Sequence, residues 1–86
     1  MQVIVVYDVP ANRTHIYRKL LRRQLEHLQN SVFYGELTKG QVTALKQDLE
    51  KKLDTDDEVV VFESTNPASF EFTTYGDADD PGSRFT

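Results

Sequence analysis

The chain has 86 residues, of which 38% are hydrophobic, and it contains no cysteine. This length fits one compact domain, and the absence of cysteine excludes disulfides and thiolate zinc sites. The formal charge of −4 argues against a uniformly basic nucleic-acid binder. Because a domain of this size gains stability from a partner subunit, we expect it to oligomerise.

The first ten residues, MQVIVVYDVP, have no basic leader and reach an acid after seven residues. This pattern is neither that of a signal peptide nor that of a membrane span. We therefore expect a cytoplasmic protein that does not associate with membranes.

Residues 2–7 contain the continuous run VIVVY of β-branched and aromatic side chains, which is typical of a central strand covered on both faces. Asp8, Val9 and Pro10 end this strand, since proline cannot donate a hydrogen bond to a sheet. Asn12 is the predicted N-cap of a helix that runs to about Glu26. Apolar side chains occupy one half of this helix and basic side chains the other.

In residues 27–37 the apolar side chains no longer follow helical spacing, which predicts a strand pair or one bent strand. Thr38 and Gln41 have capping-box spacing and predict the start of a second helix. Residues 58–62 predict another buried strand, which Asn66 and Pro67 end, and residues 70–75 predict a final strand. The second helix has apolar residues at helical spacing, namely Val42, Leu45, Leu49 and Leu53.

This order of elements predicts an α+β sandwich of the ferredoxin-like βαββαβ type with an extra C-terminal strand. The predicted domain covers residues 1–76, and residues 77–86 form an acidic tail without regular structure. Two helices would cover one face of the sheet. A second copy packed against the other face would make a two-fold homodimer, and the extra strand would pair with that copy's sheet edge.

Charge is divided unevenly along the chain. Residues 1–53 carry nine basic and five acidic side chains, whereas residues 54–86 carry one basic and nine acidic ones. Basic side chains that gather on one helix face favour salt-dependent contacts with phosphates, although such a face is also commonly only solvated. The candidate nucleic-acid-binding residues are Arg13, Arg18, Lys19, Arg22 and Arg23.

Asp8 is the candidate catalytic and metal-binding residue. It directly follows the buried run and would stand at the carboxyl end of a central strand, although a lone carboxylate there is often only a turn residue. In a two-fold dimer Asp8 can meet its own copy, and two such oxygen donors favour Mg²⁺ or Mn²⁺ shared between the subunits. The metal would polarise a phosphoryl oxygen or generate a nucleophile.

The segments VIVVYDVP, KLLRR and LQNSVFYGEL together resemble the small CRISPR-associated endoribonuclease family, Cas2. The resemblance spans residues 1 to about 63. It implies a ferredoxin-like homodimer that works with the Cas1 integrase to insert DNA fragments as new spacers, and a metal-dependent nuclease acting on RNA or duplex DNA. The family's metal-binding aspartate falls on Asp8, its serine on Ser31 and its following aromatic residue on Phe33.

Two other functions remain open from the residues alone. One is a toxin-type ribonuclease of similar architecture that acts on RNA without an integrase. The other is a regulatory module that binds a metabolite at its dimer interface and has no nuclease activity. The basic helix face favours a nucleic-acid partner over the metabolite.

Overall fold

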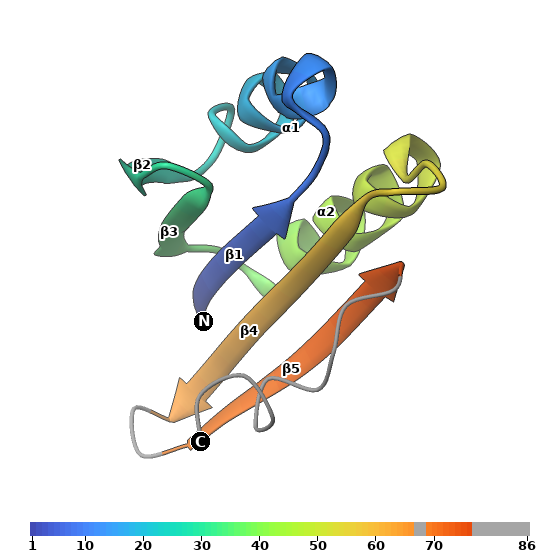
Figure 1. The fold of residues 1–86 in the computed structure, drawn as a ribbon. Helices are drawn as coiled ribbons and strands as arrows, with labels where there is room; N and C mark the ends of the chain where they lie inside the picture. The colour runs from blue at the N-terminus through green and yellow to red at the C-terminus, as the bar shows by residue number, and fades with distance from the viewer. Residues whose placement is uncertain (67–68, 77–86) are drawn as a thin grey trace.

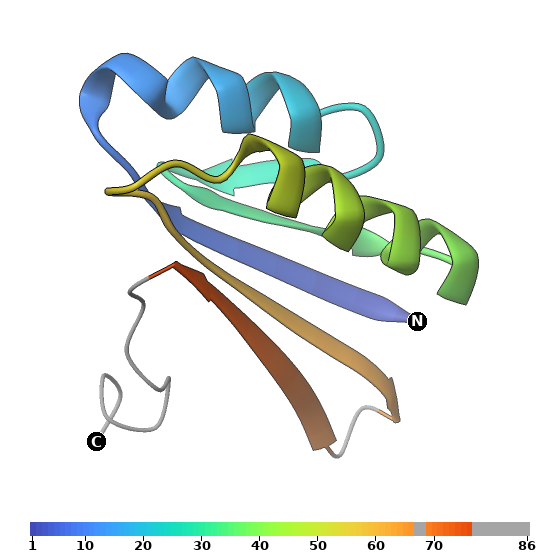
Figure 2. The ribbon, with the colours of Figure 1, turned by 90° about the vertical axis from the view of Figure 1, so that its right-hand side faces the viewer.

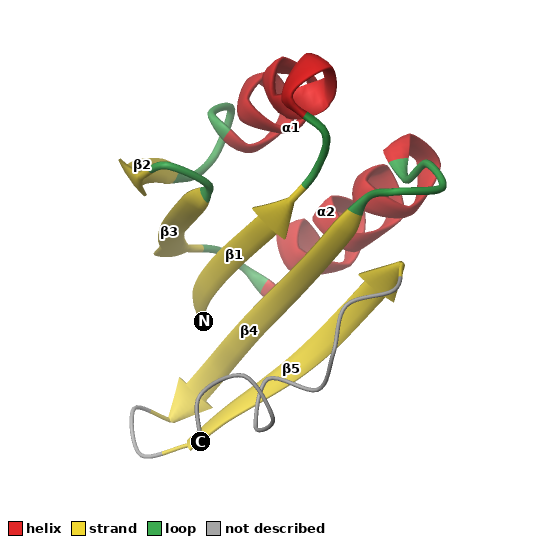
Figure 3. Cartoon of the chain, in the orientation of Figure 1, coloured by secondary structure: helices red, strands yellow, loops and turns green. Residues whose placement is uncertain are grey.

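The computed structural model describes residues 1–66 and 69–76. It contains a five-stranded antiparallel sheet in the order β2-β3-β1-β4-β5 together with two α-helices (Figures 1 and 3). This topology confirms the predicted ferredoxin-like fold with an extra strand. The elements in chain order are β1 Gln2–Asp8, the 3-10 turn η1 Ala11–Arg13, α1 Thr14–Leu21, β2 Glu26–Gln29, β3 Val32–Glu36, α2 Lys39–Lys52, β4 Glu58–Asn66 and β5 Ser69–Gly76.

Both helices lie on the same face of the sheet, as Figure 2 shows. The core lies between these two layers. β1 contributes its alternate side chains Val3, Val5 and Tyr7, and Phe33 lies beside them on β3. The ring of Tyr7 stacks on Tyr17 of α1, with ring centroids 5.5 Å apart. The first strand and the first helix are therefore joined by an aromatic contact directly beneath the end of β1.

The opposite face of the sheet has no layer over it among the described residues. The single chain therefore covers one face of β1 with its helices, and the predicted cover of the other face by a second copy stays a prediction. Ile4 and Val6 alternate with the core residues of β1 and are only half-buried. On neighbouring strands of this open face, Tyr34 is 42% exposed and Phe72 is 46% exposed.

The first helix is shorter than predicted. Asn12 lies in the 3-10 turn, and neither that turn nor α1 has a side-chain cap, so the prediction that Asn12 caps the helix is wrong. Regular helix ends at Leu21 instead of near Glu26. Leu25 is buried in the core and Glu26 already pairs with Tyr34 of β3. The residues that fit a longer helix by their spacing are therefore used in the core and in the sheet.

The second half of the chain follows the predicted order closely. Thr38 and Gln41 form the predicted capping box, with both reciprocal hydrogen bonds present. β4 is longer than predicted and continues to Asn66, because β5 pairs with it in an antiparallel register. The predicted tail, residues 77–86, lies outside the described residues. No helix in the described part of the chain is long and apolar enough to cross a membrane.

Candidate nucleic-acid interface

Asp8 is the last residue of β1 and is exposed. It continues the alternation of Ile4 and Val6, so its side chain belongs to the open face of the sheet. It also borders a shallow depression of about 310 Å³. The residues that line this depression are Tyr7, Asp8, Val9, Thr14, Arg18, Asn30 and Ser31. Asp8 therefore shares one surface hollow with Arg18 and Ser31, which the sequence had also singled out.

The turn between β2 and β3 brings Ser31 to this depression. Asn30 has a left-handed backbone with φ of 43°, a conformation that asparagine tolerates better than most residues. The carbonyl oxygen of Ser31 accepts a hydrogen bond from the backbone N–H of Tyr7 at 3.1 Å. The hairpin end is thus tied to the end of β1, next to Asp8.

Sequence reasoning missed a second carboxylate near Asp8. Glu58, the first residue of β4, pairs directly with Asp8 in the register between β1 and β4. Directly opposite residues in an antiparallel pair have Cβ atoms roughly 4.5–5.5 Å apart and point to the same face. Only the strand register reveals this pair, because 50 residues separate the two acids in the sequence.

Four of the five predicted basic residues are exposed on one side of α1 and the turn that follows it. They are Arg18, Lys19, Arg22 and Arg23. Together with His15 they line a shallow hollow of about 420 Å³. Among the described residues none of these four cations has an ion-pair partner. Their charges are therefore available to an anionic ligand.

Arg13 differs from the other four because its guanidinium group has partners within the protein. Its Nη2 lies 2.9 Å from Oδ2 of Asp57, and its Nε donates to the same carboxylate at 3.0 and 3.1 Å. Nη2 also donates to the carbonyl oxygen of Lys52 at 2.7 Å. The prediction that Arg13 binds nucleic acid stays a prediction, and the structure shows Arg13 joining the start of α1 to the end of α2.

Asp57 is the buried centre of this connection. Its carboxylate is fully buried and accepts a 2.6 Å hydrogen bond from the hydroxyl of Tyr17 and one from the backbone N–H of Asp54. Burial alone would raise the pKa of Asp57, but the hydrogen bonds from Arg13 and Tyr17 outweigh it and hold that pKa below its usual value. Burial, followed by the hydrogen bond to Asp57, raises the pKa of Tyr17.

No sequence pattern indicates this cluster, since Asp57 stands among several acids in a polar turn. The partners lie far apart along the chain, because the sequence separation from Asp57 is 44 residues for Arg13 and 40 for Tyr17. Helix periodicity placed Arg13 with the other cations. A short 3-10 turn before α1 instead rotates it toward the α2–β4 turn.

Metal ligands are few on the single chain. In the described ranges no group of three or more His, Cys, Asp or Glu side chains is placed to hold a metal ion. Asp8 and Glu58 supply the oxygen donors that Mg²⁺ and Mn²⁺ prefer, but two protein carboxylates still leave most of the coordination to water or substrate. The donor set therefore fits such an ion best where a second copy adds its own carboxylates.

Comparison with known proteins assigns the chain to a family. Residues 1–71 match the family model described as "CRISPR associated protein Cas2". A "CRISPR-associated endoribonuclease Cas2" of Haloferax volcanii is 71% identical over 86 residues, which is the full length of both chains. A protein of Thermodesulfovibrio yellowstonii named "CRISPR-associated endoribonuclease Cas2 3" is 36% identical over 75 residues, covering 86% of this chain and 85% of that one.

Solved structures agree with the sequence matches. A crystal structure described as that of Cas2 superposes with a TM-score of 0.64 at 37% identity, covering 93% of this chain and 80% of the other. Streptococcus pyogenes Cas2 superposes with a TM-score of 0.59, covering 100% and 96% of the two chains. At 22% identity that second match supports the fold alone. The chain belongs to the CRISPR-associated protein Cas2 family.

Proposed function

We propose that this protein acts in CRISPR adaptation as a homodimer that binds duplex DNA and scaffolds the Cas1 integrase during spacer acquisition. The observation that carries the proposal is the set of four exposed cations along α1 and its following turn, which have no ion-pair partner in the described part of the chain. Such side chains contact backbone phosphates without reading sequence, as capture of varied DNA fragments requires.

The open face of the sheet supports the homodimer. Tyr34, Ile4, Phe62 and Phe72 stand in register across four neighbouring strands and form an apolar row on this face. The rings of Phe62 and Phe72 lie 6.2 Å apart, and Phe72 is about half exposed. A second copy packed on this row would remove it from water, and the hydrophobic effect would favour that association.

The same dimer would give Asp8 a partner. Asp8 lies at the end of the strand that runs through the apolar row, so two copies packed through this face can bring their Asp8 carboxylates toward the two-fold axis. Mg²⁺ or Mn²⁺ bound between them would stabilise negative charge on a phosphodiester. Asp8 would orient the ion, and Arg18 in the same depression would hold a neighbouring phosphate.

Binding is tested by fluorescence anisotropy with a labelled duplex at several salt concentrations. Arg18→Gln/Arg22→Gln should weaken binding and lower the slope of log affinity against log salt by about two, since each phosphate contact contributes about 0.9. Lys39→Gln removes an exposed cation at the far end of α2 and should change the slope by less than half of one contact. Wild-type protein that binds no duplex, with or without Cas1, would refute the proposal.

Hydrolysis is tested separately with Asp8→Asn. This variant should lose Mg²⁺-dependent cleavage of RNA or duplex DNA and keep its affinity for the duplex, because the basic side chains are unchanged. The relatives' name "endoribonuclease" favours RNA as the first substrate to assay. Cleavage that survives in Asp8→Asn would place the activity at another site. Cleavage of RNA without any duplex binding would favour the toxin-type ribonuclease instead.

A further inference from the structure

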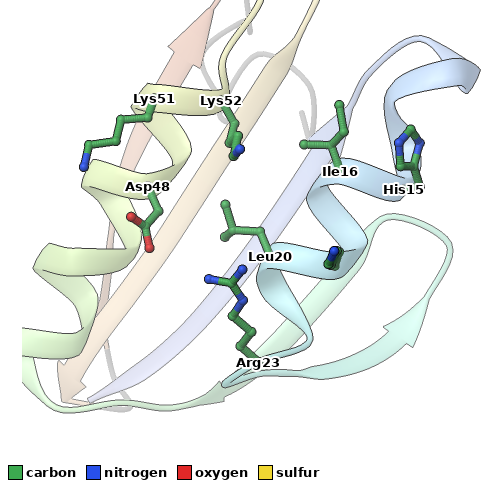
Figure 4. A pocket seen from close by; sticks show the side chains of 8 residues that line it. His15, Ile16, Leu20, Arg23, Asp48, Lys51 and Lys52 are labelled. Atoms are coloured by element: carbon green, nitrogen blue, oxygen red, sulfur yellow. The ribbon is translucent and has the colours of Figure 1, made fainter.

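A groove of about 440 Å³ lies between α1 and α2, on the side of the molecule away from the open sheet face. Figure 4 shows Arg23 from the turn after α1 and Lys52 from the end of α2 extending into the space between the two elements, with Leu20 between them. The other residues that line the groove are His15, Ile16, Lys19, Asp48 and Lys51.

The groove is strongly cationic in an acidic protein. Four basic side chains and one carboxylate give it a formal net charge of +3, whereas the whole chain carries −4. Within the described residues Lys19, Arg23, Lys51 and Lys52 have no ion-pair partner, and neither has Asp48. Arg23 and Lys52 lie in the space between the helices, whereas Lys51 is at the outer edge of the groove with its ammonium group turned away from α1 (Figure 4). Cations that face one another across a groove repel, and a bound anion relieves that repulsion.

The walls of the groove are held in place before any ligand arrives. Nη2 of Arg13 donates to the carbonyl oxygen of Lys52, and the same guanidinium is bound by the buried carboxylate of Asp57. This connection ties the beginning of α1 to the last residue of α2 at one end of the groove. A preorganised site loses less conformational entropy on binding than one that must first assemble.

The groove is also continuous with the hollow on the outer side of α1. His15, Lys19 and Arg23 line both depressions, so the two cationic surfaces meet along this helix and its following turn. A sugar-phosphate backbone presents a negative charge at every nucleotide and can follow such a surface from one depression into the next. A single small anion would engage only one of them.

We propose that the α1–α2 groove binds backbone phosphates of nucleic acid, with Lys51 and Lys52 of α2 extending the interface formed by α1. Arg13 and Asp57 act as positioning residues that set the spacing of the two helices. This inference rests on the proposed function, because the duplex that crosses α1 is the ligand whose phosphates enter the groove.

The test compares two double variants in the anisotropy assay described above. Lys51→Gln/Lys52→Gln should reduce the salt slope by about two contacts, so the ratio of wild-type to variant affinity should fall about tenfold between 50 and 200 mM salt. Asp48→Asn removes the opposing carboxylate without changing side-chain size and should strengthen binding about twofold to threefold at low salt. Circular dichroism spectra of these variants should match that of the wild type.

The outcomes distinguish failure of the groove proposal from failure of the proposed DNA-binding function. If Arg18→Gln/Arg22→Gln weakens binding while Lys51→Gln/Lys52→Gln behaves like Lys39→Gln, the duplex crosses α1 alone and the groove proposal is wrong. If wild-type protein binds no duplex, the proposed function itself fails. If a fluorescent oligoglutamate peptide loses affinity on Lys51→Gln/Lys52→Gln while the duplex does not, the groove serves an acidic protein segment and the phosphate assignment is overturned.

Discussion

Asp57 provides the sharpest prediction, because one buried carboxylate joins α1, α2 and the turn before β4. Replacing it with alanine removes the acceptor for Arg13, for the Tyr17 hydroxyl and for the Asp54 amide at once. Loss of one partner from a buried ion pair costs about 3–5 kcal/mol. The Arg13 side chain is 22% exposed and water can solvate part of its charge, so we expect the lower end, about 3 kcal/mol.

That loss is large for a chain of this size. At roughly 0.05–0.15 kcal/mol per residue, 86 residues have a free energy of unfolding of about 4–13 kcal/mol. A change of about 3 kcal/mol lowers the Tm of such a domain by roughly 12–24 °C. Urea denaturation followed by circular dichroism measures the free energy directly, and a thermal melt provides an independent check.

Asp56→Ala is the matched control. Asp56 is exposed in the same turn and has no interaction with another described residue, so its removal should change the free energy of unfolding by less than about 0.5 kcal/mol. If Asp57→Ala and Asp56→Ala have the same stability, the Arg13–Asp57–Tyr17 cluster does not hold the helices together. The preorganisation of the α1–α2 groove would then lose its physical basis.

Three further predictions follow from particular contacts. The folded-state pKa of Asp57 lies below its ordinary value of 3.8, so its contribution to stability is complete above about pH 5 and is lost as the pH falls through the folded-state pKa. Urea titrations between pH 7 and pH 2 should therefore show that the free energy of unfolding falls less steeply with decreasing pH for Asp57→Asn than for wild type. Equal pH dependence of the two proteins would contradict this. Phe72→Glu places a charge in the open apolar row and should convert the dimer to a folded monomer in analytical ultracentrifugation, whereas a variant that remains dimeric would show that the two copies meet elsewhere. Gly76→Ala should destabilise the protein by about 2 kcal/mol or more, because Gly76 has φ of +76° and an added Cβ would lie 2.0 Å from the Asp57 carbonyl oxygen. Gly40 lies in α2 with open space around it, so Gly40→Ala should stabilise the protein by about 0.5–1 kcal/mol. Thermal melts that rank the two variants in the opposite order would refute this interpretation of the backbone.

The sequence predicted those features of the fold that depend on local patterns. The apolar run before Asp8 marked the central strand, and Thr38 with Gln41 marked the start of α2, because these signals depend on neighbouring residues. The end of α1 was misplaced because Leu25 and Glu26 fit a helix locally but are held by the core and by β3. The predicted cover of the second face of β1 depends on another copy, and the chain alone covers only the helix-facing side.

The site was predictable in part for the same reason. Arg18, Lys19, Arg22 and Arg23 were recognisable as one exposed face from helical periodicity alone. Contacts between distant segments were not. The pairing of Asp8 with Glu58 depends on the register of two strands, and the role of Arg13 depends on a buried acid far along the chain.

The groove illustrates this limit most clearly. Lys51 and Lys52 end the second helix in sequence and showed no relation to the basic first helix. Packing of the two helices on one face of the sheet places them across a shared groove from Lys19 and Arg23. The cationic surface is therefore a property of the tertiary structure and extends beyond the one helix that sequence identified.

The central claim is that the basic side of α1 binds DNA while two copies meet through their open sheet faces. A structure of the protein bound to Cas1 and a DNA duplex tests it most directly. We predict phosphates within hydrogen-bond distance of Arg18 and Arg22, and the two Asp8 carboxylates facing each other near the two-fold axis. A complex in which these arginines face solvent, with the duplex held only by Cas1 or by another surface of this protein, would contradict the claim.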